Sequence, residues 1–244
     1  MKKPNLSILL AGASLLASSG AMAQAAPESS LSYNAGVVTD YRYRGISQSR
    51  LKPAVQAGVD YADKSGFYVG AWGSTIKWIK DSGATDGSFE LDLYGGYKGS
   101  AGGVAYDLGV LRYQYVGNKG LAVNANTTEI YAAGTLGMFT LKYSHALTNT
   151  FANANSKGSS YIDLSANVDL GNGFTLTPHI GRQVIKNGAI YNYTDYSLTL
   201  AKDLGKGLSA SLMAVGTNAS ADYNFGGKGY LGKDALVAGI KYTF

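Results

Sequence analysis

Charged side chains that alternate with apolar ones are the residues of this sequence best placed to do chemistry. In one such segment, leucine separates the carboxylates Glu90 and Asp92. Because successive side chains of a β-strand point to opposite faces, this spacing places both acids on one face. Acids and bases recur at equivalent positions along the chain, and opposed charges that line a water-filled pore tune its ion selectivity. The expected pore-lining residues are Asp40, Arg42, Arg44, Asp60, Glu90, Asp92, Asp107, Arg112, Glu129, Lys142, Asp163 and Asp169.

The same charges have a second interpretation, in which paired acids and bases form a solvated interior that stiffens or plugs a barrel. With Asp195 and Lys98 added to the set above, the inward positions hold nine acids and five bases. In an open pore, this excess of acids predicts a mild preference for cations. The basic residues are scattered singly along the chain instead of forming a cluster, so nucleic acid is not an expected partner.

Nucleophilic catalysis and metal binding find few suitable residues. The chain has no cysteine and only two histidines, His145 and His179. His145 follows Ser144, but neighbours in a strand point to opposite faces and cannot form a nucleophile-base pair. His179 is expected to face inward in mid-strand, far from a lipid substrate. We therefore expect no enzymatic activity, no metal site and no cofactor, and a lipid-hydrolysis assay would test the enzyme alternative.

The N-terminus has the pattern of an exported protein. A basic start, Met1-Lys2-Lys3, precedes an apolar run from Leu6 to Ala17 and the small-residue sequence Ala21-Met22-Ala23. The apolar run is too short for a membrane-spanning helix, which needs about 20 residues, and it suits a secretory signal peptide. We predict that residues 1–23 are cleaved, with cleavage after Ala25 as an alternative, and that residues 24–244 form the mature domain.

Alternation of apolar and polar residues continues through the whole mature chain and predicts strands rather than helices. Glycine and tyrosine are abundant, at 33 and 19 residues, as in β-proteins with many tight turns. The segments between the expected strands alternate between short and long, which is typical of a meander with short periplasmic turns and longer extracellular loops. Twelve strands are expected near 31–44, 53–62, 66–77, 88–98, 103–116, 127–135, 138–148, 159–170, 173–185, 195–203, 207–217 and 235–244.

This pattern predicts an all-β fold, a closed antiparallel up-and-down transmembrane β-barrel of about 12 strands. A soluble barrel or sandwich also alternates, but its apolar face points inward. Twelve meandering strands would then need apolar side chains to fill a very wide interior, whereas charged residues around a water-filled one are straightforward. We therefore favour the membrane barrel, in the outer membrane of a Gram-negative bacterium.

Several local features qualify the strand pattern. The third expected strand is apolar on both faces, so the sides of Trp72 and Ile76 stay open. The fifth changes phase between Val110 and Leu111, which would need a β-bulge. Pro178 lies inside the ninth strand, where it removes a ladder hydrogen bond. Aromatic side chains suit the headgroup level of a membrane, and those expected at the outer rim are Tyr41, Tyr43, Phe89, Tyr113, Tyr115, Tyr143 and Tyr161.

Four stretches of the chain resemble a proteobacterial family known as Gcw_chp, whose members are also named TorF-type porins. The first and most specific runs from Asp40 to Ser49 and contains Arg-Gly-Ile-Ser; the others are residues 66–74, residues 90–97, and Tyr106-Asp107-Leu108-Gly109 running into Tyr113-Gln114-Tyr115. In place of the proline that is usual in the family, Val116 precedes Gly117 here, so that loop is expected to start differently. The resemblance implies a channel-like barrel in the outer membrane and names no solute.

Together these observations predict a channel through which small hydrophilic solutes diffuse passively. Its expected partners are the lipid bilayer, lipopolysaccharide and the solutes themselves. A closed structural or receptor-like barrel, whose long last loop (218–234) contacts a partner, is the main alternative. The sequence does not specify the solute or the oligomeric state.

Overall fold

The computed structural model describes residues 29–244, so the predicted signal peptide lies outside the described residues. Thirteen strand segments form one sheet. Because β10 and β11 are two pieces of a single span, the sheet consists of twelve spans. The spans are β1 (Ser30–Val38), β4 (Ala54–Ala62), β5 (Phe67–Thr75), β6 (Phe89–Ala101), β7 (Val104–Val116), β8 (Thr127–Leu136), β9 (Phe139–Ala146), β10 (Ser160–Ala166) with β11 (Val168–Gly171), β12 (Phe174–Val184), β13 (Tyr193–Gly205), β14 (Leu208–Thr217) and β15 (Ala235–Thr243).

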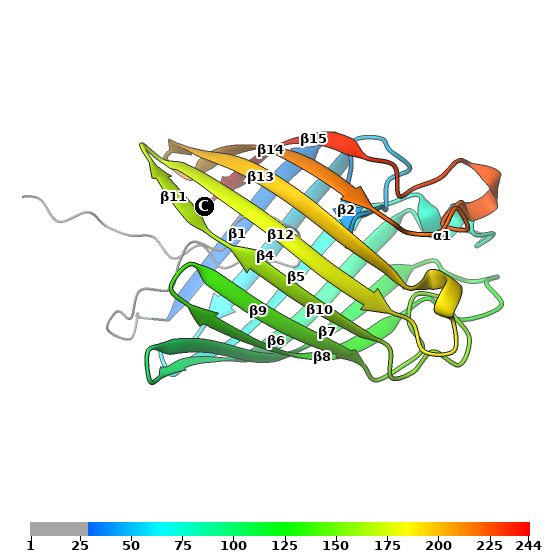
Figure 1. The fold of residues 1–244 in the computed structure, drawn as a ribbon, viewed down its shortest axis with the longest axis horizontal. Coiled ribbons are helices and arrows are strands. Elements are labelled where there is room, and N and C mark those ends of the chain that lie inside the picture. Colours follow the sequence, from blue (N-terminus) through cyan, green and yellow to red (C-terminus); the bar gives the residue numbers. More distant parts are fainter. Residues whose placement is uncertain (1–28) are drawn as a thin grey trace, which may run out of the picture.

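Pairing between the first and last strands closes the sheet into a barrel (Figure 1). Val37 of β1 lies opposite Ile240 of β15 on one side and opposite Val55 of β4 on the other. All neighbouring spans are antiparallel, so each backbone amide of the wall can find a partner on an adjacent strand. Closure leaves no free sheet edge. The predicted twelve-stranded closed antiparallel barrel is confirmed.

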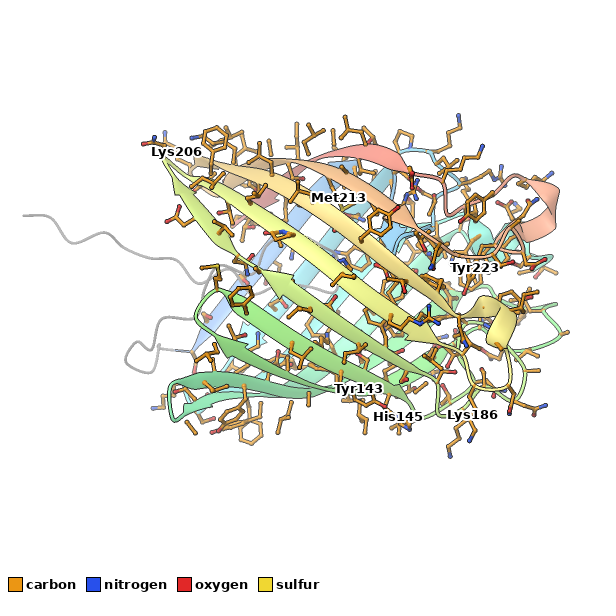
Figure 2. The ribbon with its side chains drawn as sticks, in the orientation of Figure 1. Tyr143, His145, Lys186, Lys206, Met213 and Tyr223 are labelled. Atoms are coloured by element: carbon orange, nitrogen blue, oxygen red, sulfur yellow. The ribbon has the colours of Figure 1, made fainter. Side chains whose placement is uncertain are left out.

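The connections differ sharply between the two ends of the barrel. At the short-turn end, spans are joined by a few residues, as at Lys206–Gly207, where φ values of 53° and 82° match a two-residue hairpin turn. The C-terminus lies at this end, and Lys206 labels it in Figure 2. The long-loop end carries six longer connections, which contain β2 (Arg42–Tyr43), β3 (Ile46–Ser47), α1 (Trp78–Asp81), η1 (Ala189–Tyr191) and η2 (Phe225–Gly227).

The outer face of the barrel is apolar on every span. Val55 is 60% exposed and Val69 57%, and aliphatic or aromatic side chains at alternate positions continue around the wall. Carboxylates such as Asp60 and Asp92 lie on the opposite, inner face and are buried. A soluble barrel would have these faces exchanged, because its apolar residues fill the core. No helix in residues 29–244 is long and apolar enough to span a membrane.

Two of the local expectations are wrong. The first strand ends at Val38 instead of residue 44, because the chain turns away from the sheet there. In β7, Leu111 keeps the same phase as Asp107, and the pairing with β6 and β8 has no register shift, so the expected bulge is absent from this strand. Leu111 points inward and Val110 outward, with exposed fractions of 4% and 43%.

The structure also resolves the two open features. Trp72 and Ile76 both point inward and are buried. On one side, Pro178 pairs with Leu198 of β13. On its other side lies the gap between the end of β10 and the start of β11. Ser165 of β10 still pairs with His179, and pairing with β12 resumes at Val168. The hydrogen-bond ladder is therefore interrupted beside the proline, which has no N–H to donate.

Candidate functional site

A hairpin folded into the barrel dominates the interior at the long-loop end. We name residues 40–49 the inner hairpin; its two short strands pair Arg42 with Ser47 and Tyr43 with Ile46. Arg44 and Gly45 form the tip, with φ values of 46° and 78°, as a two-residue turn of this type requires. Glycine adopts this conformation without cost, whereas arginine is uncommon in it. The tip is therefore held by its contacts.

The tip of the inner hairpin reaches walls on different sides of the barrel. Arg44 Nη2 lies 2.7 Å from Glu129 Oε2 on β8, and Nη1 donates at 2.7 Å to Gln183 Oε1 on β12. Its guanidinium also lies 4.2 Å from the ring centre of Tyr161. A Cβ added at Gly45 would lie only 2.7 Å from the Cβ of Asp195 on β13. These contacts place the tip across the lumen.

Tyrosines fix one side of the hairpin to the wall. Tyr41 donates its hydroxyl to Glu90 Oε1 at 2.9 Å and packs edge-on against Trp72, with ring centres 5.4 Å apart. The hydroxyls of Tyr43 and Tyr113 are 2.5 Å apart. Burial raises the pKa of the Tyr41 phenol well above its usual value, and the Glu90 charge adds to the shift. The phenol therefore stays protonated as a donor.

The base of the hairpin is tied by charge. Asp40 accepts hydrogen bonds from the Ser47 hydroxyl at 2.6 Å and from Ser49 at 3.1 Å. Arg42 Nε lies 2.5 Å from Asp40 Oδ2, and Arg42 Nη1 donates to the Lys233 carbonyl at 2.8 Å. Asp40 and Arg42 thus link the inner hairpin to itself and to the last long loop.

The lumen between the inner hairpin and the short-turn end is polar. Tyr94 donates to Asp60 Oδ1 at 2.5 Å, and Tyr68 donates to Asp107 Oδ1 at 2.6 Å. Lys98 Nζ lies 3.8 Å from Asp107 Oδ2. These groups come from four neighbouring strands, β4 to β7, so the polar lining covers this side of the wall. It offers both hydrogen bonds and charge to a hydrated solute.

Glycines make room for the inward tyrosines. Gly70 pairs directly with Tyr94, and Gly109 pairs with Tyr131. A Cβ at Gly70 would come within 2.5 Å of the Tyr94 ring, and a Cβ at Gly109 within 2.5 Å of the Tyr131 ring. The rings therefore lie flat over the glycine backbone of the next strand. This arrangement explains in part why glycine and tyrosine are both abundant.

A second polar cluster faces the lumen beside the tip of the hairpin. His179 Nε2 lies 2.5 Å from Asp163 Oδ2, and its Nδ1 lies 3.7 Å from Asp195 Oδ1. Tyr161 donates to Asp195 Oδ2 at 3.0 Å. The other histidine, His145, lies on the outer face beside Tyr143, with ring centres 6.4 Å apart, while Ser144 is buried. Neither histidine forms a nucleophile-base pair with a serine in the described residues.

Two buried carboxyl groups on β6 have oxygens without hydrogen-bond partners. Both oxygens of Asp92 and the Oε2 atom of Glu90 form no hydrogen bond within residues 29–244. The two side chains point inward from alternate positions of β6 and are 0% and 1% exposed. Within the described residues, no group of three or more histidines, cysteines or acids could hold a metal ion. Glu90 and Asp92 thus place two carboxyl groups in the lumen beside Tyr41.

The residues expected to line a pore fall into four groups. Arg112 points outward, contrary to our expectation, and donates to Thr128 Oγ1 at 2.9 Å, because β7 keeps its phase. Asp169 lies exposed at the short-turn end, where it accepts a hydrogen bond from the Gly171 amide at 2.8 Å. The inner hairpin, not β1, carries Asp40, Arg42 and Arg44. The inner wall carries Asp60, Glu90, Asp92, Asp107, Glu129, Lys142 and Asp163.

The prediction for several tyrosines was wrong, because they lie in the interior and not at the outer rim. Five of those expected at the outer rim lie inside, buried or partly buried. Unbroken alternation from Asp107 would have placed two of them on the inner face. For the other three, the sequence carries no signal that would have placed them inside, because a tyrosine suits a headgroup region and a polar interior equally well. The five residues are Tyr41, Tyr43, Tyr113, Tyr115 and Tyr161.

A closed twelve-stranded barrel with an apolar outer face and a polar interior has the architecture of small bacterial outer-membrane porins. The chain belongs to the Gcw_chp family, described as a bacterial protein of unknown function, whose sequence profile matches residues 22–244. The four stretches that carried this resemblance meet inside the barrel, where Tyr41 contacts Trp72 and Glu90 and Tyr43 contacts Tyr113. No curated protein sequence matches the chain significantly.

Solved structures with the same fold include two porins. The KdgM porin in complex with disordered oligogalacturonate has a TM-score of 0.56 and 8% identity, covering 88% of this chain and 99% of that one. The NanC porin has a TM-score of 0.55 and 10% identity, covering 87% of this chain and 99% of that one. At such low identity the likeness concerns the fold.

Proposed function

We propose that the protein is an outer-membrane channel for passive diffusion of small hydrophilic solutes, with the inner hairpin as the constriction at its extracellular mouth. The observation that carries this proposal is the polar lumen, in which Asp60, Tyr68 and Asp107 line the wall between the hairpin and the short-turn end. A barrel that only filled a membrane would gain more from an apolar packed interior, since buried polar groups add little net stability. The predicted signal peptide and the apolar outer face support the location.

The charges of the interior favour neutral or cationic solutes. Eight acidic side chains face five basic ones, so a polyanion such as the oligogalacturonate found with KdgM would meet a predominantly acidic lining here. The acids are Asp40, Asp60, Glu90, Asp92, Asp107, Glu129, Asp163 and Asp195, and the bases are Arg42, Arg44, Lys98, Lys142 and Lys241.

A closed, receptor-like barrel is the second candidate, favoured by the burial of the inner hairpin. Arg42 and Arg44 are 3% and 6% exposed, and the hairpin packs into a cluster of buried aromatic side chains. In this case the long loops, and not the lumen, would carry the function. The two candidates differ in one measurable property, the flow of ions.

Planar bilayers containing the mature protein test the proposal. We expect discrete conductance steps in potassium chloride, and swelling of protein-containing liposomes in small neutral sugars. Heat-modifiable gel mobility of the same sample would establish that the barrel is folded. Folded protein that stays silent, both as the natural sequence and with the hairpin contacts of Arg44 removed, would favour the closed barrel.

A further inference from the structure

A cavity of about 290 Å³ lies at the long-loop end, beside the inner hairpin. Each of the six long connections contributes to its wall, and Figure 2 shows one lining residue, Tyr223, among these loops. The hairpin itself supplies Tyr43, Ile46 and Gln48. The volume is at the small end of ligand-binding cavities, which measure roughly 300–1,000 Å³. The cavity is therefore suited to one small molecule.

The wall of this cavity is aromatic and uncharged. Eight of its eighteen lining residues are aromatic, and none is acidic or basic. Trp78 packs edge-on against Tyr115 and tilted against Phe225, with ring centres 5.0 and 5.3 Å apart. The nearby Arg44 is neutralised by Glu129. A charged ligand would lose hydration here without gaining an ionic partner, so the wall selects neutral molecules.

Two tyrosine hydroxyls in the wall have no hydrogen-bond partner in the part of the chain that the structure describes. Tyr115 and Tyr193 are 2% and 4% exposed, and neither hydroxyl forms a hydrogen bond within residues 29–244. By contrast, Tyr223 donates its hydroxyl to the Tyr191 carbonyl at 3.0 Å. Trp78 Nε1, in the same wall, is buried and also forms no hydrogen bond within residues 29–244. Groups without a protein partner that line a cavity can bond an oxygen on a ligand. The cavity thus combines ring surfaces with two free hydroxyls.

We propose that this cavity binds a neutral aromatic compound of one or two rings that carries a hydrogen-bonding oxygen. The ligand ring would pack edge-to-face or offset against the aromatic wall, and Tyr115 or Tyr193 would bond its oxygen. A sugar fits less well, because the mostly apolar wall would leave several of its hydroxyls unpaired. Binding at this site does not require that the barrel conduct.

Fluorine NMR with 4′-fluoroacetophenone and mature protein in detergent micelles tests the proposal. Protein-free micelles correct for partitioning of the probe. We expect saturable binding of one molecule per barrel. The anion 4-fluorobenzoate and the oxygen-free 1-ethyl-4-fluorobenzene should bind more weakly, and 2-fluoro-2-deoxyglucose should not bind. Absence of saturable binding, or preference for the anion or the sugar, would overturn the proposal.

Substitutions locate the site. Tyr115→Phe and Tyr193→Phe each remove a hydroxyl and keep the ring. The variant that loses the hydroxyl bonded to the ligand should bind 4′-fluoroacetophenone about two- to tenfold more weakly. The affinity for 1-ethyl-4-fluorobenzene should not change. Tyr143→Phe, on the outer face, is the matched control, and Ala122→Trp should abolish binding by filling the cavity.

Two results with the variants would contradict the site. One is saturable binding that survives Ala122→Trp; the other is an equal effect of Tyr143→Phe and the two cavity variants. Because binding is measured without a conductance readout, either result leaves the channel proposal standing. Conversely, a folded barrel that binds the probe but conducts no ions would support the ligand site and contradict the channel proposal.

Discussion

Arg44 and Glu129 lie 85 positions apart in the chain, yet their side chains form an ion pair inside the barrel, with 2.7 Å between Nη2 and Oε2. Only 6% of the Arg44 side chain and 3% of the Glu129 side chain are exposed. Removing one partner of a buried pair costs about 3–5 kcal/mol, because the other charge is left without compensation. The inner hairpin can relieve that cost by moving out of the lumen, since it belongs to no wall strand.

Glu129→Gln should therefore loosen the hairpin while keeping the shape of the side chain. We expect more frequent or larger conductance steps than in the natural protein, because Arg44 loses its counter-charge. Single-channel recording in planar bilayers measures the change. Asp86→Asn, which removes a charge from an exposed loop, serves as the control. Conductance identical to that of the natural protein would show that this pair does not hold a constriction.

A reversible disulfide can lock the hairpin in place. A Cβ added at Gly45 would lie 3.3 Å from the Cβ of Thr217 on β14, close to the roughly 3.5–4.5 Å that a disulfide needs. The natural chain has no cysteine, so Gly45→Cys with Thr217→Cys forms a unique pair. We expect the oxidised variant to be silent and dithiothreitol to restore conductance. The single Gly45→Cys variant controls for strain at this φ of 78° and for the close approach of the new Cβ to Asp195.

Ion selectivity should follow the excess of acids in the lumen. Under a potassium chloride gradient, the reversal potential should indicate a preference for cations. Asp60→Asn removes a buried inward charge, and we expect it to lower the cation-to-anion permeability ratio roughly twofold, or about 0.4 kcal/mol. Asp222→Asn in the last long loop should have little effect. An anion preference in the natural protein would direct attention to Arg42 and Arg44 instead.

The packing of tyrosine over glycine should be visible in stability. Gly109→Ala places a methyl group against the Tyr131 ring, and such overpacking costs about 1–3 kcal/mol. Gly134→Ala on β8 is the matched control, because its nearest neighbour would be Val104 Cγ1 at 3.8 Å. Urea unfolding followed by tryptophan fluorescence measures both. Equal stabilities of the two variants would mean that the ring moves aside freely.

The course of the wall strands could be predicted from the sequence because each span has its own local signal. Residues such as Glu90 and Asp92 alternate with leucines that face outward, and this period places every span and its faces without information from distant residues. Short turns such as Lys206–Gly207 then impose the antiparallel meander. The same local rule failed at Arg112 only because the apolar residues around Val110 were taken as a change of phase.

The sequence by itself therefore determined the barrel, its polar inner face and its family. Only the tertiary structure decided that residues 40–49 fold into the lumen. The alternation of Asp40, Arg42 and Arg44 is equally typical of a wall strand that continues to residue 44. No local pattern distinguishes such a strand from a hairpin that folds into the lumen. The choice depends on Glu129, Gln183 and Tyr113, which closure of the barrel brings to the hairpin from distant parts of the chain.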